Sequence, residues 1–255
     1  MTKPTRVFFL VAAGILVSGL GTGLVASYMG IQGLALIGTN GPAELAYVPS
    51  DARLVAFADV REVMNSELRQ KFRELHPQDS PDGRELEEQT GINVETDIDR
   101  VVAFFSGAAQ SQRPAFLARG NFNETRIESV IRQKGGQVED YKGRRLLVIP
   151  GNGESTTVVT FPEPGLAIVG LPEAVRLALD TKAGSDNVTD NTSVMALINE
   201  VDGDNVWVVG NFSALAGARL PDNVLRQIPP INLFAASGHI NGGIRATIRA
   251  EARDD

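Results

Sequence analysis

The feature that most constrains this chain is a long N-terminal stretch without charge. No charged residue occurs between Arg6 and Glu44. The apolar segment VFFLVAAGILVSGLGTGLVASYMG (7–30) would be about 36 Å long as a helix, enough to cross about 30 Å of bilayer hydrocarbon. Phe9 stands near one end and Tyr28 near the other, where membrane interfaces favour aromatic side chains. The stretch therefore predicts a transmembrane helix.

The charges that flank this segment predict its orientation. Lys3 and Arg6 lie on its N-terminal side, so the positive-inside rule places the N-terminus in the cytoplasm and exports the rest of the chain. The expected location is the inner (cytoplasmic) membrane, with most of the chain on the periplasmic side. A secretory signal peptide is the alternative, with an apolar region at 7–20 and cleavage near Ala26-Ser27. Both interpretations export the remainder of the chain.

Small residues recur inside the predicted span. Gly19 and Gly23 form a G-x-x-x-G pattern, and Gly14 and Ser18 repeat the same spacing one turn earlier. Such a face lets a second helix approach closely, so these four residues are candidate partner contacts within the membrane. The alternative is that glycine is simply common in membrane helices.

The charge balance of the exported part limits its partners. The chain has 24 basic and 31 acidic residues, and only Lys3 and Arg6 among them precede Glu44, which leaves a net charge of −9 on residues 44–255. Nucleic-acid phosphates require a basic surface, so we expect no nucleic-acid partner. The chain also lacks cysteine, which excludes disulfides, thiolate nucleophiles and cysteine-ligated metals.

The pattern of apolar residues divides the chain. Residues 1–30 form the cytoplasmic tip and span, and residues 31–50 read as a linker because they contain Gly, Pro, Thr and Asn. Residues 51–255 are predicted to form an exported α+β domain, an antiparallel sheet with helices on one face. This domain divides into two candidate halves, 51–150 and 151–255.

Within the exported part, strand-like and helix-like patterns alternate. Strands are predicted at 53–60, 101–106, 115–122, 156–161, 166–170 and 206–212, with a closing pair at 231–240 and 242–252. Helices are predicted at 61–75, 84–91, 123–136, 172–184 and 193–201. Residues 137–150 are predicted to form a hairpin that turns at Lys142-Gly143. The tripeptide Gly-Asn-Phe occurs at 120–122 and again at 210–212, which suggests that the two halves diverged from one α/β unit.

No arrangement of residues in the exported part resembles a known catalytic or metal site. The histidines, His76 and His239, lack metal-ligand spacing. Asp202-Gly203-Asp204-Asn205 resembles the start of a calcium loop, but Trp207 and Ser213 stand where glycine and glutamate are required. The pattern therefore indicates a turn. We expect no cofactor, no metal and no catalytic residues.

Two charged regions remain, and one of them is a candidate for contacts. Asp97 and Asp99 alternate along a predicted extended segment, which is typical of a solvated sheet edge. The stretch 113–145 is locally basic, and this is the best candidate for contact with an acidic partner. Its candidate contact residues are Arg126, Arg132, Lys142, Arg144 and Arg145.

Four segments carry a resemblance to known proteins. They are LAYVPSDARLVAFADVREVM, QTGINVETDIDRVVAFF, EDYKGRRLLV and FAASGHINGGI. Through them the chain resembles a family of uncharacterised bacterial envelope-anchored α+β proteins of unknown function, over most of residues 45–255. The resemblance implies an N-terminal apolar segment followed by an exported domain. It implies no activity and no site residues.

These observations predict a non-enzymatic, single-span membrane protein. Its globular domain is expected to act as an accessory or interaction subunit of a larger membrane complex, with other membrane proteins as partners. Two alternatives stay open: a periplasmic domain that binds a small ligand between its halves, and a hydrolase whose site one sequence does not reveal.

Overall fold

The computed structural model describes most of the chain after the predicted span. The described residues are 41–75, 87, 92–107, 113–150, 156–211, 231–241 and 243–252. The predicted transmembrane helix at 7–30 lies outside them. None of the helices in the described part combines the length and the apolar character needed to cross a bilayer.

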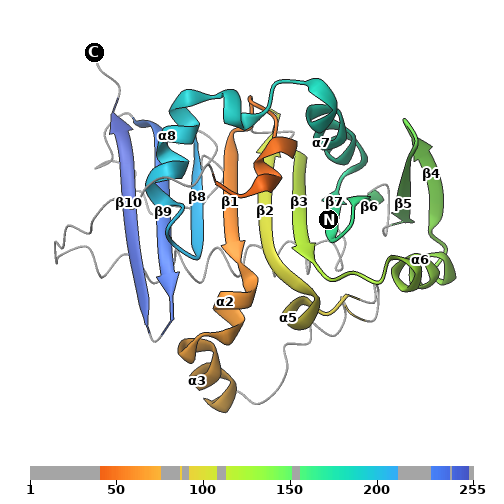
Figure 1. The fold of residues 1–255 in the computed structure, drawn as a ribbon, viewed down its shortest axis with the longest axis horizontal. Coiled ribbons are helices and arrows are strands. Elements are labelled where there is room, and N and C mark those ends of the chain that lie inside the picture. Colours follow the sequence, from red (N-terminus) through yellow and green to blue (C-terminus); the bar gives the residue numbers. More distant parts are fainter. Residues whose placement is uncertain are drawn as a thin grey trace.

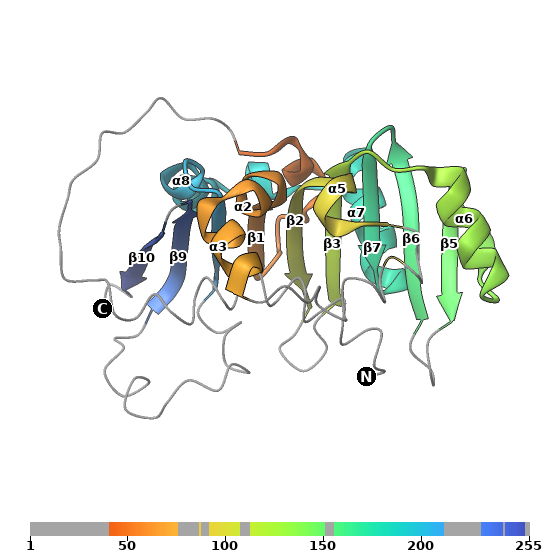
Figure 2. The same cartoon turned by 90° about the horizontal axis from the view of Figure 1, so that it is seen from below.

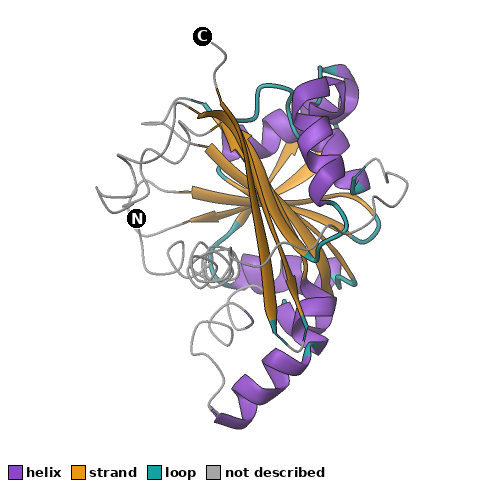
Figure 3. Ribbon diagram, turned by 90° about the vertical axis from the view of Figure 1, so that its left-hand side faces the viewer, coloured by secondary structure: helices purple, strands orange, loops and turns teal. Residues whose placement is uncertain are grey.

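The fold is α+β and is built on one ten-stranded sheet (Figure 1). Its order is β10-β9-β8-β1-β2-β3-β7-β6-β5-β4, and every neighbouring pair is antiparallel. The strands are β1 (Leu54–Asp59), β2 (Ile98–Ser106), β3 (Arg113–Gly120), β4 (Gln137–Tyr141), β5 (Arg144–Pro150), β6 (Thr156–Glu163), β7 (Leu166–Gly170), β8 (Val206–Asn211), β9 (Ile231–Ile240) and β10 (Ile244–Ala252). Viewed from the side, the strands rotate progressively across the sheet (Figure 3).

Helices connect and cover these strands (Figures 1 and 2). The α-helices are α2 (Val60–Asn65), α3 (Glu67–Leu75), α5 (Val94–Asp97), α6 (Glu124–Gln133), α7 (Pro172–Gly184) and α8 (Thr192–Val201). Two 3₁₀ helices, η2 (Ala43–Tyr47) and η3 (Val188–Asp190), complete the described helices. Helices α6 and α7 begin where the sequence predicts: Asn123 accepts a hydrogen bond from Arg126 N, and Pro172 occupies the first turn of α7.

The helices lie on both faces of the sheet, so the prediction of helices on one face is wrong. Apolar side chains of α7, α8 and η2 share a core cluster with Val102 of β2. Ile127 and Ile131 of α6 belong to another cluster, which Val101 of β2 contacts. Successive strand residues point to opposite faces. Val101 and Val102 of β2 therefore point to opposite faces of the sheet, and helices cover apolar residues on each face.

The folded domain begins earlier than residue 51. Leu45 and Val48 are fully buried in the main core, and Tyr47 is 3% exposed. Val48 also accepts a backbone hydrogen bond from Val188 at 2.7 Å. The end of the predicted 31–50 linker is therefore part of the domain, because its apolar residues pack under α7 and beside η3.

The repeated Gly-Asn pair has the same backbone surroundings in both places. Asn121 N donates to Asp97 O, and Asn211 N donates to Arg53 O, both at 2.8 Å. A Cβ on the preceding glycine would lie 1.9 Å from Asp97 O at Gly120 and 2.4 Å from Arg53 O at Gly210. Both glycines therefore permit close approach to the backbone just before a neighbouring strand, β2 in one case and β1 in the other. In the sheet, however, β6 and β7 lie between β3 and β5, so strands of the two candidate halves interleave.

Candidate partner-binding surface

The β4–β5 hairpin forms the end of the sheet that carries most of the candidate contacts. Tyr141 pairs with Arg144, and the two residues between them both have positive φ, 53° at Lys142 and 78° at Gly143. This is the type I′ turn, whose twist matches that of antiparallel strands. The turn confirms the hairpin predicted from the sequence and exposes Lys142 at its tip.

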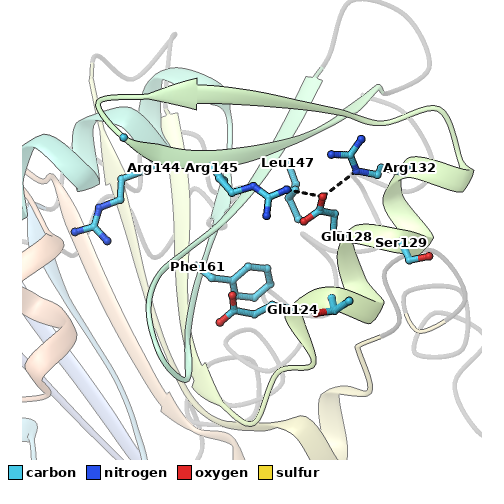
Figure 4. Close-up of a pocket in the computed structure, with 10 residues that line it drawn as sticks. Glu124, Glu128, Ser129, Arg132, Arg144, Arg145, Leu147 and Phe161 are labelled. Atoms are coloured by element: carbon cyan, nitrogen blue, oxygen red, sulfur yellow. Dashed lines mark hydrogen bonds and ion pairs between the residues drawn. The ribbon is translucent and has the colours of Figure 1, made fainter.

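Consecutive arginines on β5 bond to different elements, one to helix α6 and the other to strand β6. Arg145 reaches Glu128 of α6, whereas Arg144 points away from that carboxylate and donates to Pro162 O of β6 (Figure 4). The alternation of side chains along a strand requires this separation. We refer to Lys142, Arg144 and Arg145 together as the basic hairpin.

On the α6 side, the hairpin borders a groove of about 580 Å³. Glu128 Oε1 accepts hydrogen bonds from Arg132 Nε at 2.8 Å and from Arg145 Nη2 at 2.6 Å (Figure 4). The bond from Arg132 and the charge of Arg145 hold the pKa of Glu128 below its ordinary value, although desolvation opposes them. Leu147 and Phe161 supply the apolar part of the lining.

On the α7 side lies a second cavity, of about 410 Å³. Asp180 accepts hydrogen bonds from Lys142 Nζ at 2.6 Å and from Tyr141 Oη at 2.9 Å. The bond from Lys142 lowers the pKa of Asp180, and the same bond raises the pKa of Lys142. Tyr47 and Tyr141 both line this cavity. We call it the tyrosine cavity.

A buried ion-pair network lies next to the tyrosine cavity. Glu44 is fully buried, and its carboxylate accepts hydrogen bonds from Arg119 Nε at 2.7 Å and from Arg100 Nε at 3.2 Å. Arg119 also donates to Glu163 at 2.7 Å. Burial raises the pKa of Glu44, but the bonds from Arg119 and Arg100 lower it by more, so its pKa is below the ordinary value. The network ties η2 to β2 and β3.

Sequence reasoning missed this network. The only signal in the sequence is that Glu44 is the first charged residue after the uncharged stretch. That position marks the end of the uncharged stretch, and it does not indicate that the carboxylate is buried. Its partners are 56 and 75 residues away along the chain. Nothing local distinguishes Arg100 or Arg119 from other basic residues, so pairing at that distance is decided by the fold.

The structure brings together four of the five basic candidates. Arg132 and Arg145 meet at Glu128, while Lys142 and Arg144 line the tyrosine cavity. Arg126 is exposed on α6 and lines neither cavity described above. The membrane candidates lie outside the described residues. They are Gly14, Ser18, Gly19 and Gly23.

The other charged motifs have structural explanations. Asp97 ends helix α5, where it accepts a hydrogen bond from Asn93 N, and Asp99 pairs with Arg61. The prediction that both aspartates alternate along an extended edge is therefore wrong. Asn205 bonds both the N–H and the carbonyl of Ile240, and the stretch 202–205 is a turn before β8. In the described ranges, no three His, Asp or Glu side chains gather as potential metal ligands.

Comparisons with known proteins found a similar fold but no matching family model and no matching curated sequence. No protein-family model matches the chain, and no curated protein matches it. Two solved structures of a protein named TP0453 are similar to it. Crystal form I has a TM-score of 0.52 and 13% identity over 84% of this chain and 80% of the other. Crystal form IV has a TM-score of 0.50 and 10% identity over 80% and 78%.

At such identities the likeness concerns the fold alone. It agrees with an α+β arrangement that extends over most of the chain. The resemblance to bacterial envelope proteins stays a prediction, since neither comparison bears on it.

Proposed function

We propose that this chain is a single-span membrane protein whose exported domain binds another protein, as an accessory subunit of a membrane complex. The observation that carries the proposal is the charge-free segment at 7–30, placed a short distance before the folded domain. Lys3 and Arg6 orient it with the N-terminus in the cytoplasm. The segment contains the small-residue face of Gly19 and Gly23, which suits a helix–helix contact.

The short tether supports a role next to the bilayer. Residues 31–42 separate the proposed span from η2, and even fully extended they reach about 43 Å. The domain cannot move far from the membrane, so its partner is expected to be membrane-bound as well. Restricting both partners to one surface raises their effective concentration, which lets a modest contact suffice.

The charge distribution supports an acidic partner. Residues 44–255 are acidic as a whole, yet Lys142, Arg144 and Arg145 stand together at one end of the sheet. All three side chains are exposed. Lys142 pairs with Asp180, and Arg145 shares Glu128 with Arg132, so the three hairpin cations and Arg132 outnumber the two carboxylates that they bond. A local positive patch on a negative molecule orients an acidic partner as it approaches, and it increases the association rate more than the final affinity.

The first prediction concerns location. Because the uncharged segment is long enough to span a bilayer, the protein is expected to stay in the membrane fraction after carbonate extraction. Residues 44–255 should be degraded by protease added to spheroplasts. A cytoplasmic protein of known location is the control and must stay intact. Release by carbonate with an N-terminus near Ser27 would show a cleaved signal peptide, and protease resistance before lysis would show a cytoplasmic domain.

The second prediction concerns the partner. Replacing Lys142, Arg144 and Arg145 with glutamate is expected to reduce partner recovery from detergent-solubilised membranes at least about tenfold, because attraction becomes repulsion. The double variant Gly19→Leu and Gly23→Leu should cause a partial loss, equivalent to about 1–2 kcal/mol for one helix–helix contact. Recovery is measured by quantitative mass spectrometry of proteins that co-purify with the tagged chain.

A charge-reversed control separates a local effect from a general one. Lys71 of α3 and Arg249 of β10 are exposed and lie away from the β4–β5 end of the sheet. Changing both to glutamate should leave partner recovery near the wild-type level. Equal losses in this control and in the basic-hairpin variant would contradict the proposed surface. Unchanged recovery after the glycine substitutions would remove the membrane contact from the proposal.

A further inference from the structure

The tyrosine cavity has features of a small-molecule site. It shares Lys142 and Arg144 with the basic hairpin, but its enclosed volume and its apolar lining have no role in the proposed function. Its volume of about 410 Å³ lies within the range of ligand pockets. Tyr47 and Leu179, which are 3% and 8% exposed, give it a buried apolar lining, and Pro162 adds to it. These residues come from η2, α7 and β6, so three separate elements build the cavity.

The charges around this cavity are not balanced. Lys142 is neutralised by Asp180, with which it forms an ion pair at 2.6 Å. No described carboxylate forms an ion pair with either of the other two cations, Arg144 and Lys182. Three cations and one carboxylate therefore line the cavity, within a domain whose overall charge is negative. A concave surface of one sign concentrates the attraction for a ligand of the opposite sign.

Both unpaired cations are held in place by contacts within the cavity wall. Arg144 Nη1 donates to Pro162 O, which leaves the other guanidinium N–H groups for a ligand. Lys182 Nζ lies 5.2 Å from the centre of the Tyr47 ring, within cation–π distance. Burial and Glu163 raise the pKa of Tyr47, while the nearby charge of Arg144 lowers it. The phenol is therefore neutral at pH 7, and it does not balance the cations.

We propose that the tyrosine cavity binds a small molecule that carries a phosphate or carboxylate group on an apolar body. Arg144 presents the planar N–H fork that matches either anion, and Lys182 adds a second positive charge. A bare anion would fill only a fraction of the cavity, whereas an apolar body would contact Tyr47, Pro162 and Leu179. This site does not depend on the proposed membrane function, because it is built entirely within the domain.

The test uses the full-length protein in neutral detergent at constant ionic strength. Isothermal titration calorimetry is carried out with phenyl phosphate, benzoate, phenol and inorganic phosphate. Phenyl phosphate or benzoate is expected to bind at one site, with a Kd between about 10 µM and 1 mM, a range suited to a small ligand in an open site. Phenol lacks the anion and inorganic phosphate lacks the apolar body, so both should bind at least about tenfold more weakly. The preference between the first two probes distinguishes phosphate from carboxylate.

Matched variants locate the binding. Arg144→Gln and Lys182→Gln are each expected to weaken the better probe at least about tenfold. Arg126→Gln and Lys134→Gln remove exposed cations outside the cavity and should change the Kd less than about twofold. The proposal is overturned if neither anionic probe binds with a Kd below about 1 mM, if phenol binds as tightly as phenyl phosphate, or if the controls weaken binding as much as the cavity variants. An unchanged unfolding midpoint shows that each variant is folded.

Discussion

Replacing Trp207 with alanine is expected to lower the free energy of unfolding by about 3–5 kcal/mol, the largest effect we predict for a single substitution. Trp207 is 1% exposed in the main core, on β8. Its ring stacks on Phe57 of the neighbouring strand β1, with ring centres 5.4 Å apart. Alanine would remove this contact and leave a cavity that the sheet, fixed by hydrogen bonds on both sides of β8, cannot close.

Urea unfolding followed by far-UV circular dichroism measures this loss without depending on indole fluorescence. Trp207→Phe is the matched control and is expected to lose less. It keeps an aromatic ring beside Phe57 and removes the indole N–H, one of the buried polar atoms without a hydrogen-bond partner in the described structure. A loss below about 1 kcal/mol for the alanine variant would contradict the burial of this residue.

Replacing Glu44 with glutamine is expected to cost about 2–3 kcal/mol at pH 7. Removing one partner from a fully buried ion pair costs about 3–5 kcal/mol. The cost is lower here because the side chains of Arg119 and Arg100 are 22% and 39% exposed, so water solvates part of the charge left behind. The control Glu163→Gln removes a carboxylate that is 39% exposed and bonded to the same Arg119. It should cost less than about 1 kcal/mol.

The stabilisation by Glu44 is expected to depend on pH. Its pKa in the folded state lies below the ordinary value of 4.5, through the bonds from Arg119 and Arg100 that outweigh burial. The carboxylate therefore contributes fully above about pH 4.5, and the contribution is lost as the pH falls through the folded-state pKa. Urea unfolding at pH 7 and at about pH 3 should show the gap between wild type and Glu44→Gln narrowing in acid. A gap of equal size at both pH values would contradict this mechanism.

Elements defined by neighbouring residues are those that sequence reasoning predicts well. The turn at Lys142-Gly143, the cap at Asn123 and the start of α7 at Pro172 all agree with the structure. In each case the signal and the structure it determines lie within a few residues, because turns and caps depend on local φ angles and on hydrogen bonds to nearby backbone.

Periodicity alone did not reveal a break within the first predicted helix. The apolar stripe at 61–75 predicts one helix, but the structure has α2 and α3, separated at Ser66. Ser66 Oγ donates to Val63 O at 2.7 Å and accepts from Arg69 N at 3.2 Å, so this buried hydroxyl caps both helices. A serine hydroxyl can bond to nearby backbone groups in place of the regular helical hydrogen bonds. The sequence pattern does not show which set of bonds forms, because the outcome depends on the burial of Ser66 in the folded structure.

The sequence identified the basic residues of the candidate surface, but it did not predict how their side chains are placed relative to one another. The basic stretch included Arg132, Arg144 and Arg145, yet the sequence did not show that consecutive arginines of β5 bond to different elements, Arg144 to β6 and Arg145 to α6. Nor did it show that Tyr47 and Lys182, distant in the chain, would line one cavity with Arg144. Charge composition identifies which residues carry charge, but the distances between them depend on how the strands pair.

The sequence by itself determined the uncharged N-terminal segment, the acidic character of the domain, the α+β class and most local turns and helix starts. Only the tertiary structure decided the strand order, in which β6 and β7 separate β3 from β5, and the burial of Glu44 against two arginines. Local structure follows from short-range sterics and hydrogen bonds, which a few residues encode. Strand pairing and ion-pair burial depend on contacts between residues that are far apart in the sequence. No short segment encodes these contacts, because they form only when the whole domain packs.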